Sequence, residues 1–130
     1  MDTSSSDALQ ELVHVVAQLR NPEGGCPWDL EQTHASLVPY VLEEAHEVAD
    51  AIRHGNDGDL KEELGDLLLQ VVLHSQIASE GKCFDLTAVI RTISTKLMRR
   101  HPTYSAASRA AGRRSKPRRT LIETPAPAVR

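Results

Sequence analysis

The chain has 130 residues, which suits one domain, and an apolar content of 40% suffices for a core. Aromatic residues are only 3% of the chain, so that core must be aliphatic. No apolar run approaches the roughly 20 residues of a membrane span, and the acidic, polar start is unlike a signal peptide. Cys26 and Cys83 lack zinc-site spacing. We therefore expect a cytoplasmic protein with reduced thiols and no membrane contact.

The net charge of −3 is unevenly distributed. Residues 105–130 carry seven basic residues and one acid, for a charge of +6, which leaves −9 for residues 1–104. An acidic body argues against nucleic-acid binding and fits a body that attracts divalent cations. The Ser-, Ala-, Arg- and Pro-rich tail has too few large apolar residues to offset its ordering entropy. We expect a helical domain over residues 1–104 and a disordered basic tail over residues 105–130.

The N-terminal part of the chain predicts one helix and one loop. Apolar residues at helical spacing predict a helix over residues 7–20, with Asp7 as its N-cap. Residues 21–29 contain two prolines and two glycines, which predict a loop without helix. Trp28, the only tryptophan, either plugs one end of the core or lines a pocket.

Three further helices follow at regular intervals. The second starts at Thr33 or at Pro39 and runs to about His54, with Gly55 as its C-cap. The third runs from about residue 59 to residue 80 with Asp59 as its cap, and it is apolar on most sides, so it is central or packs against a second subunit. The fourth covers residues 86–100 behind Asp85 as its cap. This pattern predicts an all-α fold.

The second and third helices each carry two acids three residues apart. Glu44 pairs with Glu47, and Glu63 pairs with Asp66, so each pair shares one helix face. At about 100° per residue, both pairs lie at matched angles beside the apolar arc of their helix. If these arcs pack together, four carboxylates converge, and oxygen-only ligands suit Mg²⁺ or Mn²⁺. The alternative is two ordinary solvated faces, since Glu is a good helix former.

Two basic residues lie on one face near the end of the fourth helix. Lys96 and Arg100 are four residues apart. They either complement the negative end of the helix dipole or neutralise phosphate charge opposite the acids. Sequence spacing alone leaves both readings open.

The ordered set of motifs resembles the MazG nucleoside triphosphate pyrophosphohydrolases. The matching segments occur in order from about residue 9 to residue 102. They are Gly25-Cys26-Pro27-Trp28-Asp29, Glu31-Gln32-Thr33, Glu43-Glu44 with Glu47-Val48, Glu62 to Leu68, and Lys96-Leu97 with Arg99 to Pro102. A lone E-x-x-E is weak, whereas this ordered set with the G-C-P-W-D loop is highly specific.

The resemblance implies a four-helix bundle, usually dimeric, that hydrolyses nucleoside triphosphates to monophosphate and pyrophosphate with Mg²⁺. It assigns metal binding to Glu44, Glu47, Glu63 and Asp66, and phosphate contact to Lys96 and Arg100. The expected role is housecleaning of the nucleotide pool, with water attacking the α-phosphorus. Trp28 is our candidate for a further substrate contact.

The sequence departs from the family after His101-Pro102. Many members continue with a His-Val-Phe stretch and a second related domain, whereas here a basic tail follows. This keeps open the alternative of a catalytically weak helical module for dimerisation or partner binding. A nucleic-acid binder that uses the tail is disfavoured by the acidic body and by the lack of interleaved aromatics.

Overall fold

The computed structural model describes residues 4–102, and every regular element in that range is a helix. The helices are α1 (Ser5–Leu19), α2 (Pro27–Leu30), α3 (Val38–His54), α4 (Asp57–Glu80) and α5 (Leu86–Arg100). The predicted all-α class is confirmed. None of these helices is long and apolar enough to cross a membrane. The expected tail over residues 105–130 lies outside the described residues and stays a prediction.

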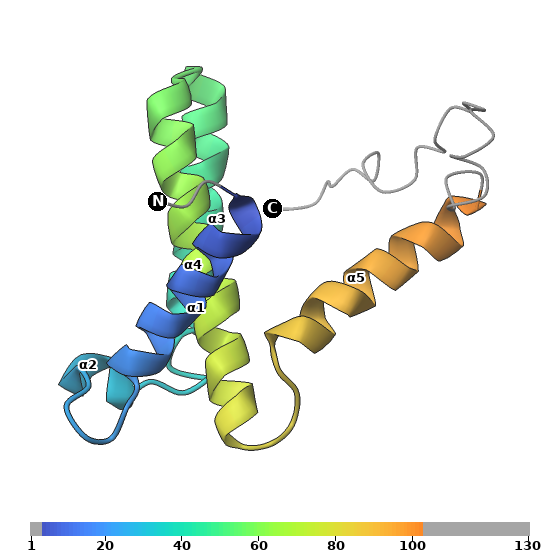
Figure 1. Cartoon of the computed structure of the whole chain (residues 1–130). Helices are drawn as coiled ribbons and strands as arrows, with labels where there is room; N and C mark the ends of the chain where they lie inside the picture. Colours follow the sequence, from blue (N-terminus) through green and yellow to red (C-terminus); the bar gives the residue numbers. More distant parts are fainter. Residues whose placement is uncertain (1–3, 103–130) are drawn as a thin grey trace. The chain divides into compact units, whose positions relative to one another are not determined.

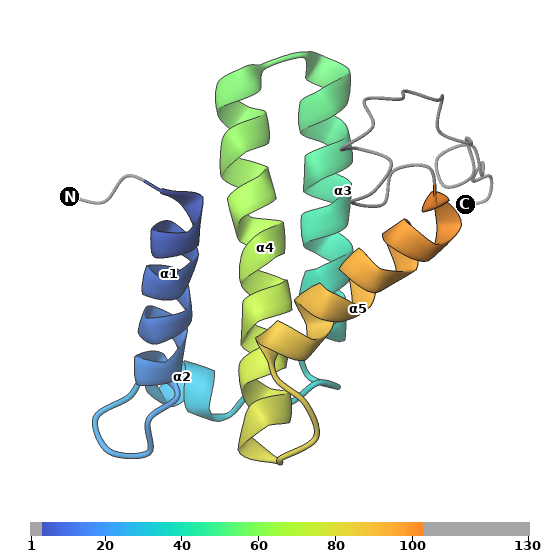
Figure 2. The ribbon, with the colours of Figure 1, turned by 45° about the vertical axis from the view of Figure 1, so that its right-hand side comes forward.

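The described chain divides into two units within α5, the first ending at Val89 and the second beginning at Ile90. In the first unit, α3 and α4 lie side by side and antiparallel, and α1 lies along α4 (Figures 1 and 2). Gly55 makes the tight turn between α3 and α4, because its φ of 72° is the left-handed conformation that glycine adopts without strain. The hairpin therefore holds the two acid-bearing helices in contact.

The core lies where α1, the turn before α3 and the C-terminal half of α4 meet. Its fully enclosed residues are Val16, Leu37, Val72 and Leu73. Leu37 has no exposed surface. Burying a side chain of that size contributes about 1.5–3 kcal/mol, so Leu37 anchors the start of α3 firmly.

Two predicted N-caps were wrong. The N-cap of α1 is Ser4, whose Oγ accepts from the backbone N–H of Asp7 at 3.0 Å; Asp7 itself lies inside the helix. Likewise Asn56, not Asp59, caps α4, with Asn56 Oδ1 accepting from the Asp59 N–H at 3.0 Å. In both cases an earlier Ser or Asn offers the cap first. For α3, the start at Val38 confirms the alternative near Pro39 over the one at Thr33.

The prediction that residues 21–29 contain no helix was also wrong. The four-residue helix α2 begins at Pro27, whose fixed φ suits the first helical position. Proline is disfavoured in the interior of a helix, but it is tolerated in the first turn. Asp85 does cap α5 as predicted, since its Oδ1 accepts from the Ala88 N–H at 2.9 Å.

Part of the apolar surface of α3 and α4 does not face the core of the first unit. Leu42 and Ile52 on α3 are each 59% exposed, and Leu64, Leu68 and Val71 on α4 are 40–47% exposed. The buried residues of α4 are instead Gln70, Val72, Leu73, Ser75 and Ala78, because α1 and Leu37 cover its C-terminal half. The rest of the first unit leaves an apolar surface on both helices of the hairpin uncovered.

Candidate metal centre

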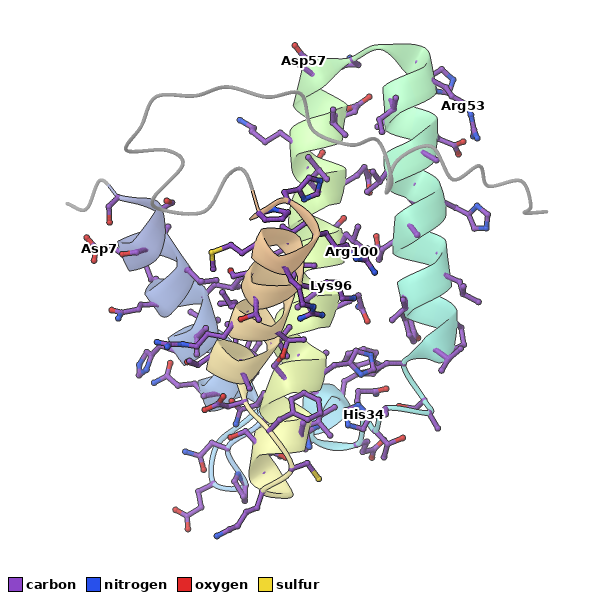
Figure 3. All side chains as sticks on the ribbon, turned by 90° about the vertical axis from the view of Figure 1, so that its right-hand side faces the viewer. Asp7, His34, Arg53, Asp57, Lys96 and Arg100 are labelled. Carbon is purple, nitrogen blue, oxygen red and sulfur yellow. The ribbon has the colours of Figure 1, made fainter. Side chains whose placement is uncertain are left out.

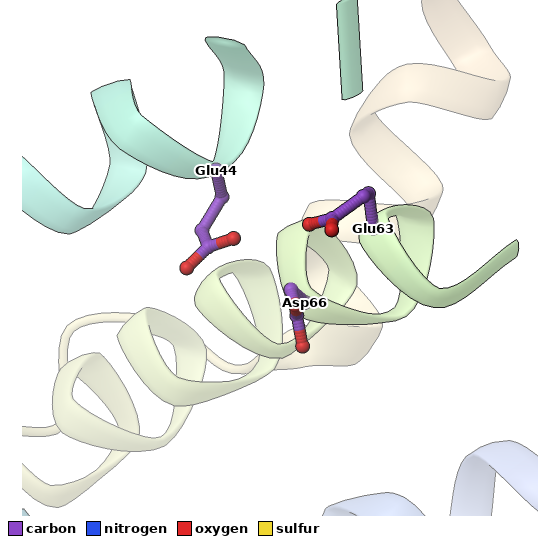
Figure 4. A group of neighbouring side chains, drawn as sticks. All are labelled: Glu44, Glu63 and Asp66. Carbon is purple, nitrogen blue, oxygen red and sulfur yellow. The ribbon is translucent and has the colours of Figure 1, made fainter. Parts of the chain in front are cut away.

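Three carboxylates meet where α3 lies beside α4. Glu44 comes from α3, and Glu63 and Asp66 come from one face of α4. One carboxylate oxygen from each of the three lies within 4.8 Å of the others. Figure 4 shows Glu44 extending from α3 towards the two acids of α4. Three of the four acids singled out in the sequence are thus brought together across two helices.

Glu47, the fourth acid, lies one turn further along α3 and is exposed. It is outside the group of three. Its negative charge nevertheless acts on Glu63 more strongly than the charges of Asp66 and Glu44 do. Glu47 therefore shares the electrostatic field of the cluster.

The pKa values of two acids of the cluster, Glu44 and Glu63, are raised. Desolvation is the largest cause of the raised pKa of Glu44, and the charges of Asp66, Glu43 and Glu47 add to it. The pKa of Glu63 is raised in the same way, by desolvation and then by Glu47, Asp66, Glu44 and Glu62. Proximity of like charges carries a free-energy cost that a bound cation removes. The carboxylate-only donor set fits a hard divalent ion such as Mg²⁺ or Mn²⁺.

Trp28 projects from α2 against α3. Its ring packs edge to face on Tyr40, with centroids 5.7 Å apart and an interplanar angle of 88°. Trp28 is 47% exposed and Tyr40 is 38% exposed, so this pair is not a core plug. Tyr40 lies four residues before Glu44 and hence on the same face of α3. An exposed aromatic pair therefore stands about one helical turn from the acids.

Sequence reasoning singled out Trp28 and missed Tyr40. The signal that could have found Tyr40 was its i, i+4 relation to Glu44 on the predicted second helix.

Lys96 and Arg100 both lie on α5, four residues apart as predicted (Figure 3). Lys96 is partly exposed and Arg100 is exposed. Both belong to the unit that begins at Ile90, and their contact with phosphate stays a prediction.

Two histidines meet at the open end of the α3–α4 hairpin. His34 lies in the turn before α3, at the end of the hairpin away from Arg53 and Asp57 (Figure 3). Its Nδ1 is 2.7 Å from Nδ1 of His74 on α4, and the ring planes differ by 4°. A hydrogen bond between two Nδ1 atoms requires one protonated and one unprotonated nitrogen. Both rings cannot be cationic while this bond exists.

The histidine pair predicts a loss of stability on acidification. Burial, followed by the charge of His34, lowers the pKa of His74. The unfolded chain therefore binds more protons near pH 6.5, and stability is lost as the pH falls through that value towards the folded pKa. Urea unfolding between pH 8 and pH 6 should show this fall in wild type. His74→Gln should flatten it, and His46→Gln, at an exposed position on α3, should not. An unchanged slope in His74→Gln would contradict the assignment.

The described residues form an all-helical fold in which three acids converge between two antiparallel helices, an arrangement from which helical proteins can assemble carboxylate metal sites. A sequence model of the MazG nucleotide pyrophosphohydrolase domain matches residues 32–105, more than half of the chain. The chain belongs to this MazG family.

Curated relatives agree with this placement. The chain is 56% identical over 94 residues to the nucleoside triphosphate pyrophosphohydrolase/pyrophosphatase MazG of Thermotoga maritima, covering 72% of this chain and 36% of that protein. It is 50% identical over 102 residues to the nucleoside triphosphate pyrophosphohydrolase of Escherichia coli K12, covering 78% and 39%. A Mycobacterium tuberculosis protein of the same name is 44% identical over 95 residues, covering 72% and 29%. The chain thus spans 29–39% of the length of these three relatives.

Proposed function

We propose that this protein hydrolyses nucleoside triphosphates to the monophosphate and pyrophosphate, with Mg²⁺ held by Glu44, Glu47, Glu63 and Asp66. The observation that carries the proposal is the meeting of Glu44, Glu63 and Asp66 within 4.8 Å across two helices. The names of the Thermotoga maritima and Escherichia coli relatives support the same reaction.

The four acids have different roles because they lie at different positions. Glu44, Glu63 and Asp66 offer oxygens to one point, and Glu47 extends the negative field along α3 towards Glu63. When bound there, Mg²⁺ supplies Lewis-acid assistance to attack at phosphorus, and Mn²⁺ can substitute because it prefers similar ligands. Carboxylate oxygens that do not bind the ion can accept hydrogen bonds from a water molecule and orient it for attack on the α-phosphorus.

Lys96 and Arg100 are proposed to contact the phosphates. Their spacing puts two cations on one face of α5. Arg presents a planar fork that matches phosphate oxygens, and Lys supplies a compact charge. Charge that grows on the leaving pyrophosphate would be stabilised by both.

Trp28 and Tyr40 are proposed to hold the base of the nucleotide. They are exposed, aromatic and about one turn from Glu44 on α3. Stacking on an aromatic ring tolerates any base, because every base has a π-face. This arrangement favours binding of several nucleoside triphosphates over strict selection of one.

The uncovered apolar surface of α3 and α4 supports the proposal of a homodimer. Its exposed residues are Leu42, Ile52, Leu64, Leu68 and Val71. A second copy of the hairpin presents the same apolar surface and can cover it in a two-fold interface.

The dimer has a direct test by sedimentation. Wild-type protein should sediment at twice the chain mass of 14.3 kDa. Leu68→Arg should sediment as a monomer, because an unpaired charge is costly in a dry interface. Val15→Arg is the matched control, since Val15 is 46% exposed on α1 and lies outside this surface. A monomeric wild type, or a dimer unaffected by Leu68→Arg, would contradict this interface.

The proposed activity is tested with purified protein, Mg²⁺ and a panel of canonical and altered nucleoside triphosphates. Pyrophosphate should appear in equal amount to monophosphate, without orthophosphate. The alternative is a catalytically weak module for dimerisation or partner binding. That alternative predicts a dimer without turnover. This assay does not address the housecleaning role or the cytoplasmic location, which stay predictions.

A further inference from the structure

Arg20 joins three parts of the first unit. It follows α1, and its Nε and Nη2 donate to the Glu80 carboxylate at the end of α4, at 2.9 and 2.7 Å. Its Nη1 donates to the backbone carbonyls of Asp29 at 2.6 Å and Gln32 at 3.1 Å. One guanidinium therefore ties α1 and α4 to the segment that contains α2.

The arginine is well enclosed and firmly paired. Its side chain is only 9% exposed. The hydrogen bond that Arg20 donates to Glu80 raises the pKa of Arg20, and the same bond lowers the pKa of Glu80, so both groups keep their charges. Hydrogen bonds between charged partners are the shorter and stronger kind.

The segment held by Arg20 has little stability of its own. A helix of one turn, such as α2, carries the nucleation cost of helix formation without the gain of propagation. Its last carbonyls also lack partners within the helix. Arg20 supplies donors to carbonyls at and just after this end. Gln32 completes the anchorage, because its Nε2 donates to the Trp28 carbonyl at 2.8 Å.

Trp28 depends on this backbone anchorage for its position. The indole is 47% exposed, and its ring contact is Tyr40. No surrounding core fixes such a ring, so its placement follows from where the backbone of α2 is held. The backbone of α2 is held by Arg20 and Gln32.

We propose that Arg20 is a positioning residue for nucleotide binding, which holds α2 so that Trp28 stands beside Tyr40. This inference rests on the proposed function, since it assigns Trp28 to the base side of the nucleotide. Arg20 acts through Trp28 and touches neither phosphate nor metal. It sets how tightly the nucleotide is held and leaves the rate of the chemical step unchanged.

Arg20 uses Nε and Nη2 for Glu80 and Nη1 for the two backbone carbonyls, so two variants can test these contacts separately. Arg20→Lys keeps the charge, but an ammonium cannot serve a carboxylate and two carbonyls in the same fork geometry. Glu80→Gln removes the charge partner on α4 and leaves Arg20 with both carbonyls. Both variants should lower Tm. Only Arg20→Lys should displace Trp28.

Trp28 reports its own position, because it is the only tryptophan in the chain. Without nucleotide, Arg20→Lys should change the emission maximum and near-ultraviolet circular dichroism of the indole at a temperature where the protein is folded. With nucleotide and Mg²⁺, Arg20→Lys should raise KM about 5- to 100-fold, the worth of one base stack, with kcat nearly unchanged. Glu80→Gln should keep the wild-type indole signal and KM.

A double-mutant cycle separates positioning from general support of the fold. In a Trp28→Ala background, Arg20→Lys should change KM by less than about twofold, because the ring that it positions is gone. Full additivity of the two effects would overturn the proposal. A wild-type indole signal in folded Arg20→Lys would overturn it as well. If wild-type protein hydrolyses no nucleotide, the proposed function fails, and the nucleotide-free comparison still decides whether Arg20 positions Trp28.

Discussion

Asp66→Asn should abolish Mg²⁺-dependent hydrolysis while the helices remain folded. Asp66 supplies one of the three oxygens that meet within 4.8 Å, and an amide oxygen carries no charge to hold the cation. We expect kcat/KM to fall at least about 100-fold, equivalent to a few kcal/mol of transition-state stabilisation. Glu47→Gln should act in the same direction. Steady-state kinetics over a range of Mg²⁺ concentrations, with far-ultraviolet circular dichroism as the check of folding, gives the result.

The same variant should gain thermal stability in metal-free buffer. After desolvation, the charge of Asp66 contributes to the raised pKa values of Glu44 and Glu63, so loss of that charge relieves repulsion in the folded state. Glu11→Gln is the control, because Glu11 is an exposed acid on α1 outside the cluster. It should leave turnover and Tm near wild type. Full activity in both Asp66→Asn and Glu47→Gln would contradict the proposed four-acid metal site.

Lys96→Ala and Arg100→Ala should each lower turnover with little change in Tm. If the pair stabilises charge on the departing pyrophosphate, each lost contact is worth roughly 2–4 kcal/mol, or about 30- to 1,000-fold in kcat/KM. Arg100→Lys should also be harmful, because an ammonium cannot reproduce the planar fork on phosphate oxygens. Kinetics and melting curves on the same preparations separate the two effects.

Arg99→Ala is the matched control for this pair. Arg99 is an exposed cation in the last turn of α5, next to Arg100 in sequence, and it lies roughly 100° around the helix from Arg100 and roughly 60° from Lys96. If Lys96 and Arg100 only complement the helix dipole, all three alanine variants cost a few tenths to about 1 kcal/mol of stability and none affects catalysis. That outcome would leave the phosphate side of the site without assigned residues.

The parts of the fold that depend on local order could be predicted from the sequence. Helical spacing located α1, α3, α4 and α5, and it placed Glu44 on a face that could meet Glu63 and Asp66, because both are consequences of 3.6 residues per turn. Gly55 and Asp85 carried clear end signals. The caps of α1 and α4 were predicted wrongly because each helix start offers two capable residues three positions apart, Ser4 and Asp7 for α1 and Asn56 and Asp59 for α4.

Features that depend on contacts distant in the chain could not be predicted. Glu80 is 60 residues from Arg20, and their ion pair has no sequence signal. The apolar pattern of α4 left open whether that helix is central or packs against a second subunit. The structure leaves Leu64 exposed because α1 and Leu37 cover the C-terminal half of α4 instead. Periodicity identifies an apolar face without identifying what covers it.

The most direct test of the account is the site of bond cleavage, measured by ³¹P NMR of the products formed from a nucleoside triphosphate and Mg²⁺ in ¹⁸O-labelled water. Attack at the α-phosphorus predicts nucleoside monophosphate that carries the label, together with unlabelled pyrophosphate. Labelled orthophosphate with nucleoside diphosphate, or no product at all, would contradict the assignment of this chain as a nucleoside triphosphate pyrophosphohydrolase.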